Sequence, residues 1–372
     1  MIYRDGVVVN IVRTWEGAGI FEVEVDSAPT NATLIGKGQR LHALAYDRIV
    51  GPVKVGDRLR LECSALAKRL GTGGQASVVT NLSALPSDYL PNGHMVKARY
   101  MPTQVMVSAA DEQGSPTHDK LTRIENVPVV AADLHSQPPP PIVAPAIISG
   151  ARAAKADARI AYVMTDGAAL PLPLSMQVAE LVRANWLCGT VTAGQAWGGT
   201  YEAVSIPSAL QVAAAALSAD LIVVSQGPGN LGGDTEFGFS GVDVAWTLTA
   251  AAVLGARPIA ALRISGADKR NRHLGLSHHT HTVLADLTQV GVDLPLPSFA
   301  TLDNMPEGFD ALVAKQVAQA CAGRHHIREV DASGAYELLQ DSPVRLRTMG
   351  RSLEEDAAIF VSGWAAGNYA LS

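Results

Sequence analysis

One stretch of the chain concentrates side chains that bind anions and exchange protons. Between residues 263 and 281, four basic side chains and four of the ten histidines occur in a chain whose formal net charge is −6. Guanidinium groups bind phosphates and carboxylates through paired hydrogen bonds, and imidazole exchanges a proton near neutral pH. The residues are Arg263, Lys269, Arg270, Arg272, His273, His278, His279 and His281. We expect Arg270 and Arg272 to hold an anion and His278 or His279 to act as general acid or base. Metal binding and purely structural hydrogen bonding are the alternatives.

A glycine-rich loop, Gln226–Asp234, is the second feature that predicts a ligand site. Glycines let the backbone approach a ligand closely and present amides to an anion. The spacing matches neither the dinucleotide-binding fingerprint nor a P-loop, so the cofactor stays unknown, and a flexible turn is the alternative interpretation. The glycines expected to bind substrate are Gly227, Gly229, Gly232 and Gly233.

Carboxylates at other predicted strand ends complete the set of candidate residues. Asp166 follows an apolar strand-like run and would orient the catalytic histidine or bind a metal. Asp133 and His135 are alternate residues, which project to the same side of a strand as metal ligands require. Together with His281 they are the metal candidates, although turn hydrogen bonds would also explain the pair. Whether a metal binds is left open.

Strand-like and helical patterns alternate from Arg159 onward. Apolar runs such as Leu221–Val224 are continuous, which is typical of strands covered by helices on both faces. The alternation predicts an α/β fold with a doubly wound, mainly parallel sheet. The carboxyl ends of parallel strands share one edge, so we expect the glycine-rich loop and the histidine-rich loop, Ser265–Thr282, to meet there.

The N-terminal part shows shorter runs with period two, separated by turn residues. Phe21, Val23 and Val25 alternate with acidic residues, as a half-buried strand requires. We predict a small β-barrel or sandwich over residues 1–135, a proline-rich connector over 136–150 and a Rossmann-like α/β domain over 151–372. The expected strands are Val7–Arg13, Ile20–Val25, Ala32–Ile35, Leu41–Tyr46, Arg58–Glu62 and Gln75–Asn81, followed by Val96–Val107 and Val127–Leu134.

Composition narrows the classes of partner. The chain is 48% hydrophobic but lacks the run of about 18 apolar residues that a membrane span needs. A negative net charge disfavours nucleic acid, which requires a distributed basic surface. Three widely spaced cysteines and the absence of a secretory pattern at the start favour the cytoplasm. A homo-oligomer is compatible with these observations.

Seven segments together resemble a bacterial family known as a domain of unknown function, with no established activity. The resemblance spans most of the chain and implies a cytoplasmic bacterial protein, but it assigns no catalytic residue. The segments are Leu70–Gly74, Gly93–Tyr100, Asp133–Ser136, Thr165–Pro171, Gly194–Gln195 with Gly198–Gly199, Gly227–Gly229 and Gly275–His279.

Three functions fit the residues. The first is a hydrolase or group transferase that acts on a small anionic substrate such as a phosphate ester. The second is a non-catalytic regulatory module that binds a nucleotide or another metabolite. The third is a structural component of an assembly. Binding of a ligand would separate the first two from the third, and recovery of an unchanged ligand would separate the second from the first.

Overall fold

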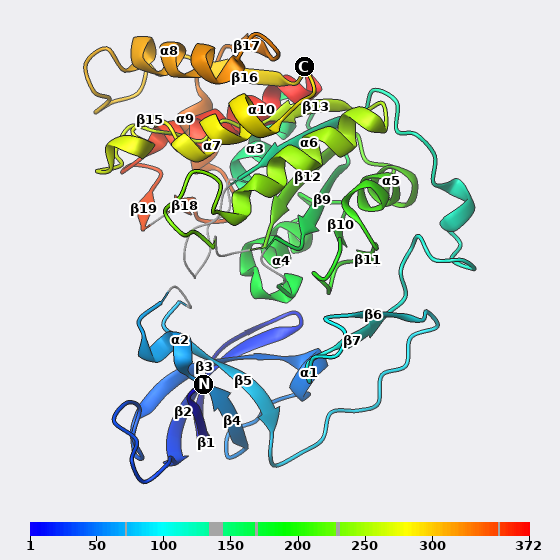
Figure 1. The fold of residues 1–372 in the computed structure, drawn as a ribbon, viewed down its shortest axis with the longest axis vertical. Helices are drawn as coiled ribbons and strands as arrows, with labels where there is room; N and C mark the ends of the chain where they lie inside the picture. Colours follow the sequence, from blue (N-terminus) through cyan, green and yellow to red (C-terminus); the bar gives the residue numbers. More distant parts are fainter. Residues whose placement is uncertain (71–72, 134–143, 168–169, 228–230, 349) are drawn as a thin grey trace.

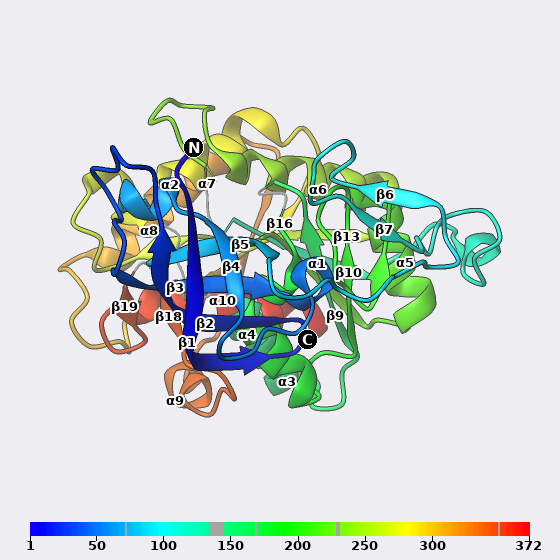
Figure 2. The same ribbon diagram turned by 90° about the horizontal axis from the view of Figure 1, so that it is seen from below.

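A small barrel and a larger α/β domain make up the computed structural model (Figure 1). The structure describes residues 1–70, 73–133, 144–167, 170–227, 231–348 and 350–372. Seen from below, the barrel strands lie in front of the α/β domain (Figure 2). Among the described helices, none has the length and apolar character needed to cross a bilayer.

Five strands close the N-terminal barrel. They are β1 (Tyr3–Trp15), β2 (Ala18–Ser27), β3 (Arg40–Tyr46), β4 (Arg58–Glu62) and β5 (Gln75–Asn81), with short helices α1 (Asp47–Val50) and α2 (Ser64–Ala67). The strand order is β1-β2-β3-β5-β4, and β4 pairs with β1 to complete the barrel. Only β3 and β5 run parallel among these neighbours. This arrangement has the topology of the OB-fold, and it confirms the predicted β-rich N-terminal unit.

The alternating pattern of β2 places its apolar side chains in the barrel core. Phe21, Val23 and Val25 are buried together, while Glu22 and Glu24 on the opposite face are only partly buried. The alternation of apolar and acidic residues along β2 therefore separates the apolar interior of the barrel from its polar outer face, as the sequence predicts.

The segment Ala32–Ile35 does not form the strand predicted from its sequence. Ile35 has a φ of 54°, in the left-handed region, which interrupts extended backbone. The carbonyl oxygens of Leu34 and Ile35 instead accept hydrogen bonds of 2.7 and 2.6 Å from the guanidinium of Arg4. The buried arginine of β1 thus satisfies carbonyl groups that a sheet partner would otherwise bind.

The α/β domain is built on eight parallel strands and two layers of helices. The strands are β8 (Pro128–Ala132), β9 (Ile160–Thr165), β10 (Gly189–Thr192), β11 (Tyr201–Glu202), β12 (Leu221–Gln226), β13 (Arg257–Ala260), β16 (Asp293–Pro297) and β17 (His326–Val330). The helices are α3 (Ala144–Ala154), α4 (Met176–Arg183), α5 (Ile206–Leu217), α6 (Asp243–Val253), α7 (His278–Thr282), α8 (Phe309–Cys321), α9 (Ala335–Gln340) and α10 (Ala357–Leu371). Short strand pairs complete the chain: β6 (Met95–Lys97) with β7 (Val105–Val107), β14 (Ile264–Ser265) with β15 (Gly275–Leu276), and β18 (Arg347–Thr348) with β19 (Arg351–Ser352).

The order of the large sheet is β11-β10-β9-β12-β8-β13-β16-β17, and every pairing is parallel. Ala161 and Val163 of β9 pack in one apolar cluster with α5 and α6. Tyr162 and Met164 of the same strand pack in a second cluster with α3 and α10. Both faces are therefore covered, which confirms the predicted α/β class.

β8 lies at the centre of this sheet, between β12 and β13. The predicted domain boundary at residue 135 places the strand Val127–Leu134 in the N-terminal domain. In the structure this strand pairs instead with strands of the α/β domain. All five residues of β8 are buried, as a strand covered on both faces requires. Helix α3 begins at Ala144, within the segment expected to be a connector. The run Pro138–Pro141 lies outside the described residues.

Close contact between α3 and α10 was not predicted from the sequence. A Cβ atom at Gly150 would lie 1.9 Å from the Trp364 carbonyl oxygen, and one at Gly367 would lie 1.7 Å from the Ile147 carbonyl oxygen. Glycine at both positions lets the two backbones touch. Most side chains of α10 are buried, so the helix has no polar face that would mark its period.

The prediction of a single strand over Val96–Val107 is wrong, because this segment turns back on itself as the β6–β7 hairpin. The hairpin joins the α/β domain through a buried lysine. Lys97 Nζ donates hydrogen bonds to the carbonyl oxygens of Thr192 and Ala196, at 2.9 and 2.7 Å, and to Glu202 Oε2 at 2.9 Å. The barrel makes its own contact, because Trp15 Nε1 donates to the carbonyl oxygen of Pro173 at 2.6 Å. These contacts hold the β6–β7 hairpin and the barrel against the α/β domain.

Candidate functional site

Neighbouring strands β8 and β12 connect to opposite faces of the sheet. The helix that follows β8 is α3, on one face, and the helix that follows β12 is α6, on the other (Figure 1). In doubly wound sheets, ligands bind in the crevice outside the carboxyl ends of such a strand pair. The candidate site lies there and extends to the residues that follow β13.

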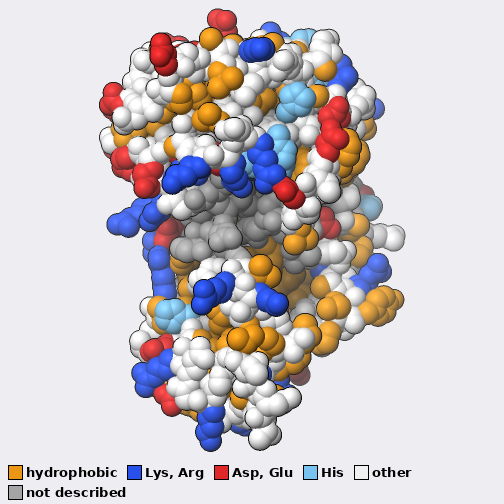
Figure 3. All heavy atoms as spheres, turned by 60° about the vertical axis from the view of Figure 1, so that its left-hand side comes forward, with side chains coloured by type: hydrophobic (Ala, Val, Ile, Leu, Met, Phe, Trp, Pro, Cys, Tyr) orange, Lys and Arg blue, Asp and Glu red, His pale blue; other side chains and the backbone are white. Residues whose placement is uncertain are grey.

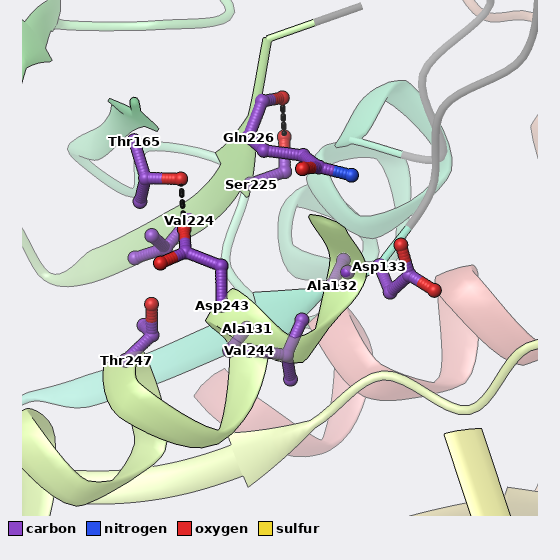
Figure 4. A pocket seen from close by; sticks show the side chains of 11 residues that line it. Ala131, Ala132, Asp133, Thr165, Val224, Ser225, Gln226, Asp243, Val244 and Thr247 are labelled. Carbon is purple, nitrogen blue, oxygen red and sulfur yellow. Dashed lines mark hydrogen bonds between the residues drawn. The ribbon is translucent and has the colours of Figure 1, made fainter. Parts of the chain in front are cut away.

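A small pocket lies beside these strand ends (Figure 4). Its polar side chains are those of Asp133, Thr165, Ser225, Gln226, Asp243 and Thr247. The hydroxyl of Thr165 donates a hydrogen bond to the Asp243 carboxylate. Burial raises the pKa of Asp243, while this hydrogen bond lowers it by a smaller amount. The pocket therefore combines neutral hydrogen-bonding groups with carboxyl groups that are costly to ionise.

Gln226, the last residue of β12, has an unsatisfied side chain in this pocket. Its side chain is buried, and neither Oε1 nor Nε2 has a hydrogen-bond partner among the described residues. From the sequence, Gln226 is identified only as the first residue of the glycine-rich loop. A glutamine at the end of an apolar strand was the signal that could have identified it.

Asp133 lies just beyond the end of β8 and is 5% exposed. Burial raises its pKa, and the positive charge of Arg263 partly opposes that shift. A Cβ atom at Gly241 would lie 2.3 Å from Asp133 Oδ1, so only glycine leaves room for this carboxyl group. His279 Nδ1 is 3.9 Å from Asp133 Oδ2, which is too long for a direct hydrogen bond.

Three of the predicted histidines form a cluster beside Asp133. The ring centroids of His278 and His279 are 4.2 Å apart, and His273 lies 4.8 Å from the first ring and 5.3 Å from the second. Ser277 anchors the group, because its Oγ lies 2.8 Å from His273 Nδ1 and accepts a hydrogen bond from the His279 amide at 3.3 Å. The short helix α7 thus begins with two imidazoles at the strand ends.

Burial and nearby positive charges favour the neutral form of the imidazoles in this cluster. Burial is the first cause that lowers the pKa of His273 and of His279 to about 3, and Arg263 adds a positive charge that lowers both further. The pKa of His278 is lowered by burial and then by Arg272. His278 Nε2 and His279 Nδ1 have no hydrogen-bond partner among the described residues. Each ring therefore has one buried nitrogen whose hydrogen-bonding capacity is not used by the described residues.

The two loops that the sequence predicts to meet are in contact. Asp234 at the end of the glycine-rich loop forms an ion pair with Arg272 of the histidine-rich loop. Phe239 stacks on His279, with ring centroids 4.0 Å apart and planes 9° from parallel. On the face of the α/β domain drawn in Figure 3, side chains of lysine or arginine lie beside histidines. The stacking was not predicted, because Phe239 lies outside both loops.

The arginines expected to hold an anion already have carboxylate partners. Arg270 binds Asp268 through two hydrogen bonds of 3.0 and 2.9 Å, and Arg272 pairs with Asp234. Arg351 joins Asp268 at 3.3 Å and Asp356 at 2.9 Å. Burial alone would raise the pKa of Asp268, but the hydrogen bonds from Arg270 outweigh it and the pKa is lowered. This network links the histidine-rich loop to the start of α10.

The glycine-rich loop differs in detail from an open anion cradle. None of its described glycines, Gly227, Gly232 and Gly233, has a positive φ, whereas Asp234 has a φ of 61°. The Gly233 amide donates to the Gly238 carbonyl oxygen at 2.7 Å, so it is occupied within the loop. Gly227 is buried at the end of β12, while Gly232 and Gly233 are exposed. Gly229 lies outside the described residues.

Asp166 lies at the end of β9, on the side of β10. Its Oδ2 accepts a hydrogen bond of 3.1 Å from the Gln195 amide, and a Cβ at Gly194 would lie 2.1 Å from this carboxylate. Within the described part of the chain, Asp166 forms no hydrogen bond or ion pair with either His278 or His279. Its role as their orienting carboxylate therefore stays a prediction.

The metal candidates are only partly described. His135 lies outside the described residues, and His281 is a half-buried residue of α7. Among the residues that the structure describes, no group of three or more histidine, cysteine, aspartate or glutamate side chains is arranged to hold a metal ion. Asp133 and His281 therefore belong to no such group there.

The fold and site define an α/β protein with an OB-type barrel and a polar site where the connections of its parallel sheet reverse. The chain belongs to the family described as "Protein of unknown function (DUF3866)", whose sequence profile matches residues 42–367. The match runs from β3 to α10, and it confirms the resemblance drawn from the sequence.

Comparisons with curated proteins and with solved structures assign no function to the chain. None of the curated proteins matches the chain. The solved structure described as "Crystal structure of YjeQ from Thermotoga maritima" is 13% identical, with a TM-score of 0.15, and the match covers 53% of this chain and 60% of that one. The chain thus spans less than two thirds of that structure, and a likeness of this size carries no argument about fold or function.

Proposed function

We propose that the protein is an enzyme that transfers or hydrolyses a group on a small anionic substrate, such as a phosphate ester. The carrying observation is the pair of half-buried imidazoles, His278 and His279, each with one buried ring nitrogen that has no partner among the described residues, beside the carboxyl ends of the strands. A neutral imidazole is the form that a general base needs. The three unpaired cysteines support a reducing compartment, and we propose the bacterial cytoplasm as its location.

The positive side chains around the imidazoles connect substrate binding with proton transfer. Arg263, Arg270 and Arg272 each contribute to the low pKa of the histidines. A bound anion would offset these charges and move the imidazole pKa upward, closer to neutral pH. The base would then be strongest when the substrate is present.

In the proposed hydrolysis, one imidazole takes a proton from a water molecule whose oxygen forms the new bond to the transferred group. The bond to the leaving oxygen breaks, and the imidazolium returns the proton to that oxygen. In a group transfer, a hydroxyl of an acceptor replaces the water. Neither reaction changes an oxidation state, so no oxidant or reductant is needed.

A panel of phosphate esters and inorganic phosphate tests the proposal by calorimetry. His278→Ala and His279→Ala should weaken or abolish turnover of any ester that the wild-type protein converts, while binding of that ester remains measurable. His326→Ala is the matched control, because this histidine is exposed on β17. Unchanged turnover in both site variants would rule out the proposed base.

A regulatory module that binds a metabolite without chemistry is the second candidate. The observation in its favour is that Arg270 and Arg272 are already paired with carboxylates, as they would be in a binding site whose charges are balanced. A ligand that raises the melting temperature and is recovered chemically intact after long incubation would favour this function over the enzyme.

A further inference from the structure

The Gln226 carboxamide is the most unusual polar group of the pocket. Its residue is 3% exposed, and both amide atoms lack a hydrogen-bond partner among the described residues. A buried polar group that makes no hydrogen bond costs about 1–3 kcal/mol. Leucine has a similar size and would avoid that cost, so the packing of β12 does not explain a glutamine here.

The position of Gln226 connects this cost with a ligand. The residue ends β12 beside β8, where the connections of the sheet reverse. Figure 4 shows its amide and the Asp133 carboxyl group on the side of the pocket away from the Thr165–Asp243 pair. A Cβ atom at Gly167 would lie 2.7 Å from Gln226 Oε1, so glycine there lets the backbone approach the amide closely. The amide therefore lines the pocket at the carboxyl ends of the strands, which is where doubly wound sheets bind their ligands.

A carboxamide presents one acceptor and two donor hydrogens side by side. Its complement is a flat edge that also carries a donor next to an acceptor, and each of the four common nucleobases has such an edge. The arginines and histidines beside the strand ends supply the matching chemistry for a phosphate. A nucleotide combines the two groups in one molecule.

We propose that the Gln226 carboxamide binds the edge of a nucleobase, and that the ligand of this site is a nucleotide. The inference rests on the proposed function for the anionic part of the ligand. Gln226 acts in it as a residue that determines specificity, and the proton transfer is left to the histidines.

Calorimetry with the four nucleoside 5′-monophosphates and with ribose 5-phosphate tests this inference. The wild-type protein should bind at least one nucleotide ten times more tightly than ribose 5-phosphate, which corresponds to about 1.4 kcal/mol. Gln226→Leu should reduce that preference to less than threefold and leave the affinity for ribose 5-phosphate unchanged. Gln319→Leu, on the exposed face of α8, is the matched control.

A second variant keeps the test independent of how well the first one folds. Gln226→Glu replaces the donors with a second acceptor, so it should move the preference toward guanine, whose edge offers two neighbouring donors. Thermal unfolding without ligand adds a readout, because Gln226→Leu removes two unsatisfied atoms and should leave the melting temperature equal or higher.

The outcomes separate the two proposals. Equal binding of all nucleotides and ribose 5-phosphate by the wild-type protein, or a base preference that persists in Gln226→Leu, would overturn the role of Gln226. Binding of nucleosides with no binding of ribose 5-phosphate or inorganic phosphate would uphold Gln226 and remove the anion-binding part of the proposed function.

Discussion

The ring of Phe239 lies flat against the imidazole of His279, with centroids 4.0 Å apart. Phe239 follows the glycine-rich loop, and His279 belongs to the histidine-rich loop, so the stack joins the two parts of the candidate site. Such a stack restricts the rotation of the imidazole and excludes water from one of its faces. Both effects favour the neutral ring that the proposed proton transfer uses.

Asp234→Asn should raise the affinity for inorganic phosphate about two- to fivefold at low ionic strength. The Asp234–Arg272 pair is largely exposed, with side chains 72% and 46% accessible, so its loss should change stability by less than about 0.5 kcal/mol. The substitution removes a negative charge and releases the guanidinium for the anion. Calorimetry at two salt concentrations measures the effect.

Glu236→Gln is the control for this experiment, because it removes an exposed negative charge two residues beyond the end of the same loop. An equal gain in both variants would indicate a general charge effect. A loss of affinity in Asp234→Asn would contradict a role for Arg272 in holding the anion.

Strand ends were the part of the site that the sequence could predict. The run Leu221–Val224 identifies a buried strand. Because parallel strands end at one edge of the sheet, the glycine-rich loop after this strand is predicted to lie near the histidine-rich loop after β13. β8 was misassigned because an apolar run before a proline-rich segment carries no information about its strand partners. The partners of Arg351 also lie beyond sequence reasoning, since Asp268 is 83 residues away.

His279→Gln should make the protein less sensitive to acid. Burial lowers the pKa of His279 to about 3, whereas the ordinary value is 6.5. Between these values the unfolded chain binds a proton that the folded chain does not, so stability is complete above about pH 6.5 and falls as the pH decreases toward 3. From pH 7 to pH 4.5 the wild-type protein should lose about 1–3 kcal/mol more than the variant.

Urea unfolding at both pH values measures this difference. His326→Gln is the control, because its side chain is exposed on β17. Equal losses in the wild-type protein and in His279→Gln would mean that the imidazole is protonated in the folded state.

Lys97→Met should destabilise the protein by about 3–5 kcal/mol, because it leaves the Glu202 carboxylate buried without its cation. Lys97 is 4% exposed and Glu202 6%. The double variant Lys97→Met/Glu202→Leu removes both charges and should recover part of the loss, since the carbonyl oxygens of Thr192 and Ala196 still lack the lysine as donor. Urea unfolding of the single and double variants gives the comparison, and an equal loss in both would show that the charge pair is not the cause.

Gly367→Ala should separate α3 from α10, because its methyl group would lie 1.7 Å from the carbonyl oxygen of Ile147. Backbone atoms cannot yield as a flexible side chain does, so the two helices must shift, and we expect a loss of at least about 2 kcal/mol. Gly36→Ala is the control, since a Cβ atom there has nothing within 4 Å. Thermal unfolding of both variants measures the contrast. A melting temperature that Gly367→Ala leaves unchanged would contradict the close helix contact, which covers the face of the sheet opposite α5 and α6.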